Sequence, residues 1–306
     1  MMPMVFDIED CAQCSLDEAI DALKAVDFDP LCEERTQKAA IWLRRLSNNR
    51  GFLAELLVDQ LAGRQGGALA AIDSGYGPQA IVLSPHYAGP TGGMFLRANI
   101  WPAETDLCFQ TSGAMNFVYG KPHDHNFGFL TVGYCGPGYQ SDYFEYEYDE
   151  VAGYAGEPVD LRFLERSALH EGKLMLYRAH RDVHSQLPAE ALSVSLNVMH
   201  VDPSIGWHDQ YGFDLEERRV NRVLSPNSTE AFLRVAVASG ACEAMNFAEW
   251  VGRSHPSDRL RLASFEARAS LLACEADEDQ LWRMAETSGS RMLTAVAETR
   301  RAVLAA

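Results

Sequence analysis

The spacing of hydrophobic positions changes twice along the 306 residues of the chain. Up to about residue 66, apolar residues recur every three or four positions, which is typical of amphipathic helices. Ser15 followed by Glu18 has the order of a capping box, so we expect one helix to begin there. Two more are predicted over 34–46 and 51–61, and the same spacing returns after residue 226. Both regions are therefore predicted to be helical.

Between them the chain is dense in Gly, Pro, Tyr and His, and turn residues separate its short apolar or alternating runs. These runs predict strands over 80–83, 94–100, 117–119, 127–134, 139–148, 174–177 and 192–200. Many short strands at this spacing indicate an all-β sandwich or barrel rather than βαβ units. We therefore predict a mainly β fold with three parts: a helical segment over 1–67, a β-barrel over 68–225 and a helical segment over 226–306.

Composition and charge narrow the classes of function. Hydrophobic residues make up 47% of the chain, enough to bury a large core. The net charge of -17 repels phosphate groups, so we expect no nucleic-acid partner and no anionic membrane surface. No apolar run approaches the roughly 18 residues of a membrane span, and the first residues lack the basic region of a signal peptide. We therefore expect a cytoplasmic protein.

The cysteines do not predict a disulfide framework. The chain has seven, an odd number, and their spacing is irregular. Cys11 and Cys14 form a CxxC, but only Val5 and Phe6 stand where a thioredoxin-like motif needs a strand, and no second CxxC completes a zinc site. We interpret the pair as two thiols without a redox or metal-binding role. The sequence shows no evident internal repeat either.

The most specific chemical signal is the pair His123 and His125. On a strand, residues two apart project from the same face, so both imidazoles could bind one metal ion. Asp124 would then face the other side and bind no metal. A strand, a tight Cys-Gly-Pro-Gly turn and a return strand follow, and His184 arrives later between two further predicted strands.

This layout resembles the cupin superfamily, whose first motif is G-x5-H-x-H-x3,4-E-x6-G. His123, His125 and Gly136 fit that motif, although Phe117 stands at its opening glycine. The second motif is G-x5-P-x-G-x2-H-x3-N. Gly172 and His184 fit it with one inserted residue. The resemblance covers residues 114–201 and implies a double-stranded β-helix barrel with α-helical N- and C-terminal additions.

The match to the second motif is incomplete. Arg178 and His180 occupy its proline and glycine positions, and its closing asparagine is absent. The glutamate of the first motif falls on Phe129 or Leu130, which cannot bind metal. Cysteine dioxygenase-like cupins also lack this glutamate and bind Fe(II) through three histidines. The resemblance therefore implies Fe(II), with Zn, Mn, Ni and Cu as alternatives.

The sequence leaves the third histidine open between two residues. His184 fits the motif spacing and is the preferred ligand, together with His123 and His125. His180, followed by Arg181, matches an "HR" pair of the dioxygenase-like cupins. If one of the two binds the metal, the other can hydrogen-bond beside it, so His180 is also a candidate catalytic residue.

Several other side chains are candidates for the pocket. The candidate phenols near the metal are Tyr134, Tyr139 and Tyr143, of which Tyr143 is preferred. The candidate clamps for a substrate carboxylate are Arg178, which is preferred, and Arg181. The return strand alternates, with Tyr143, Glu145 and Glu147 on one face and aromatic residues on the other. If the first face looks inward, Glu145 or Glu147 could replace the missing carboxylate ligand; otherwise tyrosines form the pocket wall.

These candidates predict an Fe(II)-dependent oxygenase that acts on a small polar or amino-acid-like substrate with O₂. One alternative is a metal-dependent cupin isomerase or lyase, in which the ion acts only as a Lewis acid. The other is a non-catalytic cupin-type binding protein. We expect the helical additions either to pack on the β core or to form the interface of a homo-oligomer.

Overall fold

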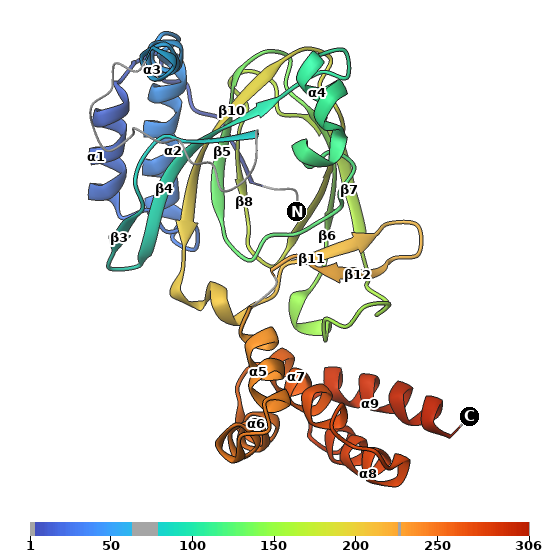
Figure 1. Cartoon of the computed structure of the whole chain (residues 1–306). Helices are drawn as coiled ribbons and strands as arrows, with labels where there is room; N and C mark the ends of the chain where they lie inside the picture. Colours follow the sequence, from blue (N-terminus) through green and yellow to red (C-terminus); the bar gives the residue numbers. More distant parts are fainter. Residues whose placement is uncertain (1–3, 63–78, 226–227, 306) are drawn as a thin grey trace. The chain divides into compact units, whose positions relative to one another are not determined.

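The computed structural model describes residues 4–62, 79–225 and 228–305, which form two compact units (Figure 1). The first unit comprises residues 1–148 and 159–218, and the second comprises 149–158 and 219–306. The boundary predicted between residues 67 and 68, and the one predicted between 225 and 226, adjoin or lie within stretches outside the described residues. The N-terminal helices belong to the same unit as the seven-stranded and three-stranded sheets.

The larger sheet of the first unit has seven antiparallel strands. Their order is β1-β8-β5-β10-β4-β2, and β3 pairs with β4. The strands are β1 (Met4–Phe6), β2 (Ala80–Val82), β3 (Tyr87–Gly89), β4 (Gly92–Trp101), β5 (Phe129–Cys135), β8 (Leu174–Tyr177) and β10 (Ser193–Val201).

The smaller sheet has three antiparallel strands in the order β7-β6-β9. They are β6 (Gln140–Glu145), β7 (Arg162–Ala168) and β9 (Asp182–Gln186). A further short strand of this unit is β11 (Tyr211–Asp214). Among the described residues the two sheets remain separate and do not close into one barrel.

The larger sheet has an outer and an inner face, because successive side chains of a strand point to opposite sides. Outward residues such as Leu130, Leu196 and Val198 join the core under the N-terminal helices. Inward residues such as Phe129 and Tyr177 join a second cluster with residues of the smaller sheet. Figure 1 shows the helices on one side of the sheet and β6 and β7 on the other.

The N-terminal helices are α1 (Leu16–Val26), α2 (Glu33–Asn48) and α3 (Phe52–Leu61). The predicted capping box is confirmed, because Ser15 and Glu18 bond each other's backbone N–H groups. A short helix, α4 (Leu107–Ser112), leads to a 3-10 turn over Ala114–Phe117. The strand predicted over 117–119 is wrong, since this turn ends at a left-handed Val118 with φ of 60°.

The second unit contains β12 (Arg219–Val223) and five helices among its described residues. They are α5 (Ser228–Ala238), α6 (Cys242–Ser254), α7 (Asp258–Ala269), α8 (Glu275–Glu286) and α9 (Arg291–Leu304). α6 and α8 begin at residues 242 and 275, and α7 and α9 at 258 and 291, so each pair is 33 residues apart. The helix pairs thus repeat in spacing, and Ala-Cys-Glu-Ala recurs at 241–244 and 273–276, at the starts of α6 and α8. The expectation that the sequence has no internal repeat is therefore wrong for this unit.

Six of the seven predicted strands are confirmed in outline, and 174–177 is reproduced to the residue. The prediction of a mainly β fold is corrected, because nine α-helices accompany the sheets among the described residues. The helical flanks account for this difference, since their helices are longer than most of the strands between them. None of the described helices combines the length and the apolar character that crossing a membrane requires.

Candidate metal centre

Backbone pairing brings His123 and His184 together. His123 N–H donates to the carbonyl of His184 at 3.0 Å, and His184 N–H donates back to that of His123 at 2.9 Å. Residues that exchange both bonds in an antiparallel pair stand opposite each other with side chains on one face. The strand predicted for the HxH is not formed: His123 makes isolated bridges to His184 and to Gly212. The pairing still places the side chains of His123 and His184 on one face, as a regular strand would.

The three rings converge in the interior. The ring centroids are 4.6 Å apart for His123 and His184, 4.9 Å for His123 and His125, and 5.0 Å for His125 and His184. One ring nitrogen from each lies within 4.8 Å of the others, and all three residues are buried. In the part of the chain that the structure describes, no other group of three His, Cys, Asp or Glu donors meets this criterion.

Hydrogen bonds orient two of the rings. His123 Nδ1 lies 2.6 Å from the carbonyl oxygen of Lys121, which can only accept, so Nδ1 carries the proton. Its Nε2 is left as a lone-pair donor, 3.3 Å from Nε2 of His184. His184 Nδ1 lies 3.3 Å from the phenol oxygen of Tyr177. Both imidazoles therefore present Nε2 to the same point, as metal-binding histidines do when the other nitrogen is held.

Burial keeps the cluster neutral. It lowers the pKa of His123 to about 4, with a smaller opposing effect from the bond to Lys121. Burial also holds the pKa values of His125 and His184 well below the ordinary range, and the neighbouring His123 adds to both shifts. Neutral imidazole is the form that binds metal. His125 Nδ1 is buried and has no hydrogen-bond partner among the described residues, which a bound cation would explain.

Tyrosines extend the site behind His184. The phenol oxygens of Tyr143 and Tyr177 are 3.0 Å apart, and Tyr139 also bonds Tyr177. Burial raises the pKa of Tyr143 to about 12, so its phenol keeps its proton. Tyr143, the phenol predicted to act at the metal, stands opposite His184 in the pairing of β6 with β9, with the ring centroids 6.5 Å apart. Tyr134 lies elsewhere, in the core of the outer face.

The inner face of the larger sheet adds a polar layer that the sequence analysis missed. Arg97 stands opposite Asn197, which in turn stands opposite Thr131. Burial is the main cause of the low pKa of His125, and the positive charge of Arg97 makes a smaller contribution, so the guanidinium acts electrostatically on this ring. Buried polar atoms of Asn99, Thr131 and Asn197 have no hydrogen-bond partner among the described residues. The alternation of Leu96 and Ala98 with two polar residues was the signal that could have revealed this layer.

His180 and Arg178 lie outside the histidine cluster. His180 adopts a left-handed φ of 59° in the turn before β9, and its ring contacts those of Tyr148 and His208 at 4.4 and 4.8 Å. Arg178 forms an ion pair with Asp182, which is fully buried. The predicted third ligand, His184, is the one that joins the HxH pair.

The candidate carboxylates also have other partners. Glu145 faces inward and is buried, but it pairs with Arg162, Arg178 and Arg181. Glu147 is exposed. Asp124 points away from the cluster, where it accepts hydrogen bonds from the Tyr146 phenol at 2.5 Å and from the Tyr211 N–H at 2.6 Å. The prediction that Asp124 is not a ligand agrees with this position.

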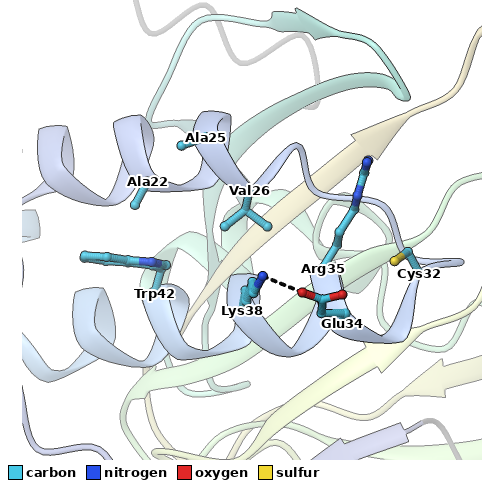
Figure 2. Close-up of a pocket in the computed structure, with 8 residues that line it drawn as sticks. All are labelled: Ala22, Ala25, Val26, Cys32, Glu34, Arg35, Lys38 and Trp42. Atoms are coloured by element: carbon cyan, nitrogen blue, oxygen red, sulfur yellow. Dashed lines mark hydrogen bonds and ion pairs between the residues drawn. The ribbon is translucent and has the colours of Figure 1, made fainter.

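A hollow lies between α1 and α2, on the outer side of the sheet (Figure 2). It encloses about 420 Å³ and is lined by Ala22, Ala25, Val26, Cys32, Glu34, Arg35, Lys38 and Trp42. Lys38 pairs with Glu34 at 2.6 Å and Arg35 with Asp27 at 2.7 Å. Because these cations already have carboxylate partners, the hollow offers less to a polar ligand than the histidine cluster does.

No protein-family model and no curated protein matches the chain. It is similar to the structure of a salicylate 1,2-dioxygenase from Pseudaminobacter salicylatoxidans, with 12% identity, a TM-score of 0.23, and coverage of 48% of this chain and 31% of that one. The capsular polysaccharide assembling protein CapF from Staphylococcus aureus is similar with 7% identity, a TM-score of 0.19, and coverage of 45% of this chain and 33% of that one. A prolyl 4-hydroxylase from Phytophthora capsici is similar with 10% identity, a TM-score of 0.25, and coverage of 95% of this chain and 83% of that one. The chain spans about a third of the first two, and TM-scores this low carry no argument.

Proposed function

We propose that this protein is a non-haem Fe(II)-dependent oxygenase with a cupin-like double-stranded β-helix, acting on a small carboxylate or amino-acid-like substrate. His123, His125 and His184 would hold the metal. The observation that carries the proposal is that three buried, neutral imidazoles meet without a carboxylate among them. Imidazole ligands suit Fe, Zn, Cu and Ni, and three of them leave positions open on the ion.

The charge of the site favours an anionic substrate. Three neutral ligands leave the double positive charge of the ion uncompensated, and Arg97 adds a cation that acts on His125. A guanidinium can bind a carboxylate through two parallel hydrogen bonds. We therefore assign the clamp to Arg97, because its charge acts on His125, whereas Arg178 lies outside the histidine cluster.

Other residues of the chain would orient the reactants. Tyr177 holds His184 through Nδ1, and Tyr143 supports Tyr177 from behind. The amide of Asn197 stands on the same inner face as Arg97 and can bond a polar substrate group. When bound, Fe(II) would supply the redox chemistry and a place for substrate and O₂ side by side. A catalytic role of His180 remains a prediction. Its ring contacts Tyr148 and lies outside the histidine cluster.

Metal analysis tests the proposal. Protein loaded anaerobically with Fe(II) should hold about one iron per chain, and His184→Ala should lose most of it, because too few ligands remain. The matched control is His180→Ala, four residues away, which should retain the iron. The loaded protein should consume O₂ with small carboxylates or amino acids.

Two outcomes would favour the alternatives. Turnover without O₂ in protein loaded with Zn, Mn or Ni would indicate an isomerase or lyase. Failure to bind any divalent metal in a His184-dependent manner would contradict both enzyme hypotheses and favour a binding protein.

A further inference from the structure

Gln186 is a fourth side chain at the histidine cluster. It lies two residues after His184 on β9, so both project from the same face of the strand. Its side chain is buried, with an exposed fraction of 3%. The amide nitrogen Nε2 lies 3.1 Å from Nε2 of His184, and the amide oxygen Oε1 has no hydrogen-bond partner among the described residues.

The spacing of these atoms matches that of ligands around one ion. Two donor atoms that each lie about 2.1 Å from an ion are about 3.0 Å apart at right angles and about 3.4 Å apart in a tetrahedron. His123 and His184 present Nε2 atoms 3.3 Å apart. The end of the Gln186 amide stands 3.1 Å from His184, within the same range.

The amide can present its oxygen instead of its nitrogen. The two atoms of an amide are nearly the same in shape, so their assignment follows from the surrounding hydrogen bonds. Without an ion, the nitrogen suits the lone pair of His184. The oxygen is then left buried without a partner, which is unfavourable. A cation at the cluster would reverse this preference, because it takes the lone pair of His184 and attracts the amide oxygen.

We infer that Gln186 supplies a fourth, neutral protein ligand through Oε1. The inference rests on the proposed metal site and deepens it. Gln186 would occupy the coordination position for which the chain has no carboxylate, since Phe129 and Leu130 stand at the motif positions. A neutral oxygen fills that position without reducing the charge of the ion. An octahedral ion with four protein ligands keeps two open positions.

Binding of Co(II) to the full-length chain tests this role without any assay of activity. Gln186→Ala should weaken Co(II) binding about 10–100-fold and change the visible absorption of the bound ion, because one ligand is lost. Gln186→Glu should strengthen binding about 10-fold, because it keeps the shape and adds a negative charge. The Gln186→Glu variant also keeps the inference testable if Gln186→Ala does not fold. Ser185→Ala, on the same strand but the opposite face, is the matched control and should bind like the parent chain.

The outcomes separate this inference from the proposed function. If the parent chain binds Co(II) and His184→Ala does not, while Gln186→Ala binds with unchanged affinity and spectrum, Gln186 is not a ligand and the three-histidine site stands. If the parent chain itself binds no Co(II), the proposed function and the ligand role of Gln186 both fall. Weaker binding by Gln186→Ala with an altered spectrum supports the inference.

Discussion

The two faces of the larger sheet differ in what lies against them. On the outer face Leu130, Leu196 and Val198 pack under α1 and α2, and each is almost completely buried. On the inner face, one residue away along the same strands, Thr131 and Asn197 carry buried polar atoms without hydrogen-bond partners among the described residues. Buried polar atoms are nearly always paired in folded proteins. The outer face therefore supplies stability, while the inner face keeps the features of a binding site.

The clearest way to sharpen this comparison is to truncate two neighbours of β10. Leu196→Ala should lower the free energy of unfolding by about 2–5 kcal/mol, because it leaves a cavity in the outer core. Asn197→Ala should change it by no more than about 1 kcal/mol, because the amide nitrogen lacks a partner whose loss would be felt. Urea denaturation of both variants measures the difference. Equal losses of stability would contradict the assignment of separate roles to the two faces.

A smaller effect is expected from the charge on the inner face. Arg97→Met should weaken the binding of a small carboxylate to the metal-loaded protein about 10–100-fold, because one charge-assisted hydrogen-bonded contact is lost. Calorimetric titration measures this affinity. Arg166→Met removes an arginine whose ion pair with Asp142 is exposed, so carboxylate affinity should stay unchanged. An equal effect of both substitutions would mean that only the overall charge matters.

The sequence could predict the ligands better than it could predict their surroundings. His123 and His125 stand at motif spacing, and His184 follows at nearly the expected distance, so local pattern carried enough information. Arg97 reaches the site because β4 pairs with β10, a contact between segments about a hundred residues apart. Gln186 is visible only once β9 is known to be a strand. Long-range pairing of this kind leaves little trace in the local spacing of residues.

The same limit applies to the fold. The helix caps at Ser15 and Ser257 are local features, and both were predictable from a few residues. The ion pairs of Arg178 with Asp182 and Glu145 depend on how β6 and β9 align, so the sequence alone left Arg178 as a candidate clamp. In the C-terminal unit the repeat of the helix pairs also has a local trace, since Ala-Cys-Glu-Ala recurs at 241–244 and 273–276 and both Ser257 and Ser290 cap helices.

The smallest expected effect concerns the thiols beside the outer core. Cys14 has an exposed fraction of 5% and belongs to that core, whereas Cys11 is exposed. Burial, with a smaller contribution from Glu18, raises the pKa of Cys14 from 9.0 to about 11, so its thiol stays protonated at pH 8. Only thiolate reacts with iodoacetamide, so Cys11 should be labelled in the folded chain and Cys14 should not. Mass spectrometry of the labelled peptides checks this.

The sign of the pH dependence follows from the same shift. Because the folded-state pKa is raised, the protonated thiol of Cys14 stabilises the fold fully below pH 9, and this contribution is lost as the pH rises towards about 11. Labelling of Cys14 should therefore begin only above pH 9 in the folded chain, while in urea both cysteines should react alike. Equal labelling of Cys11 and Cys14 at pH 8 without urea would show that the outer face opens to solvent. That result would contradict the description of the outer face as a closed core, and with it the contrast to the ligand-binding inner face.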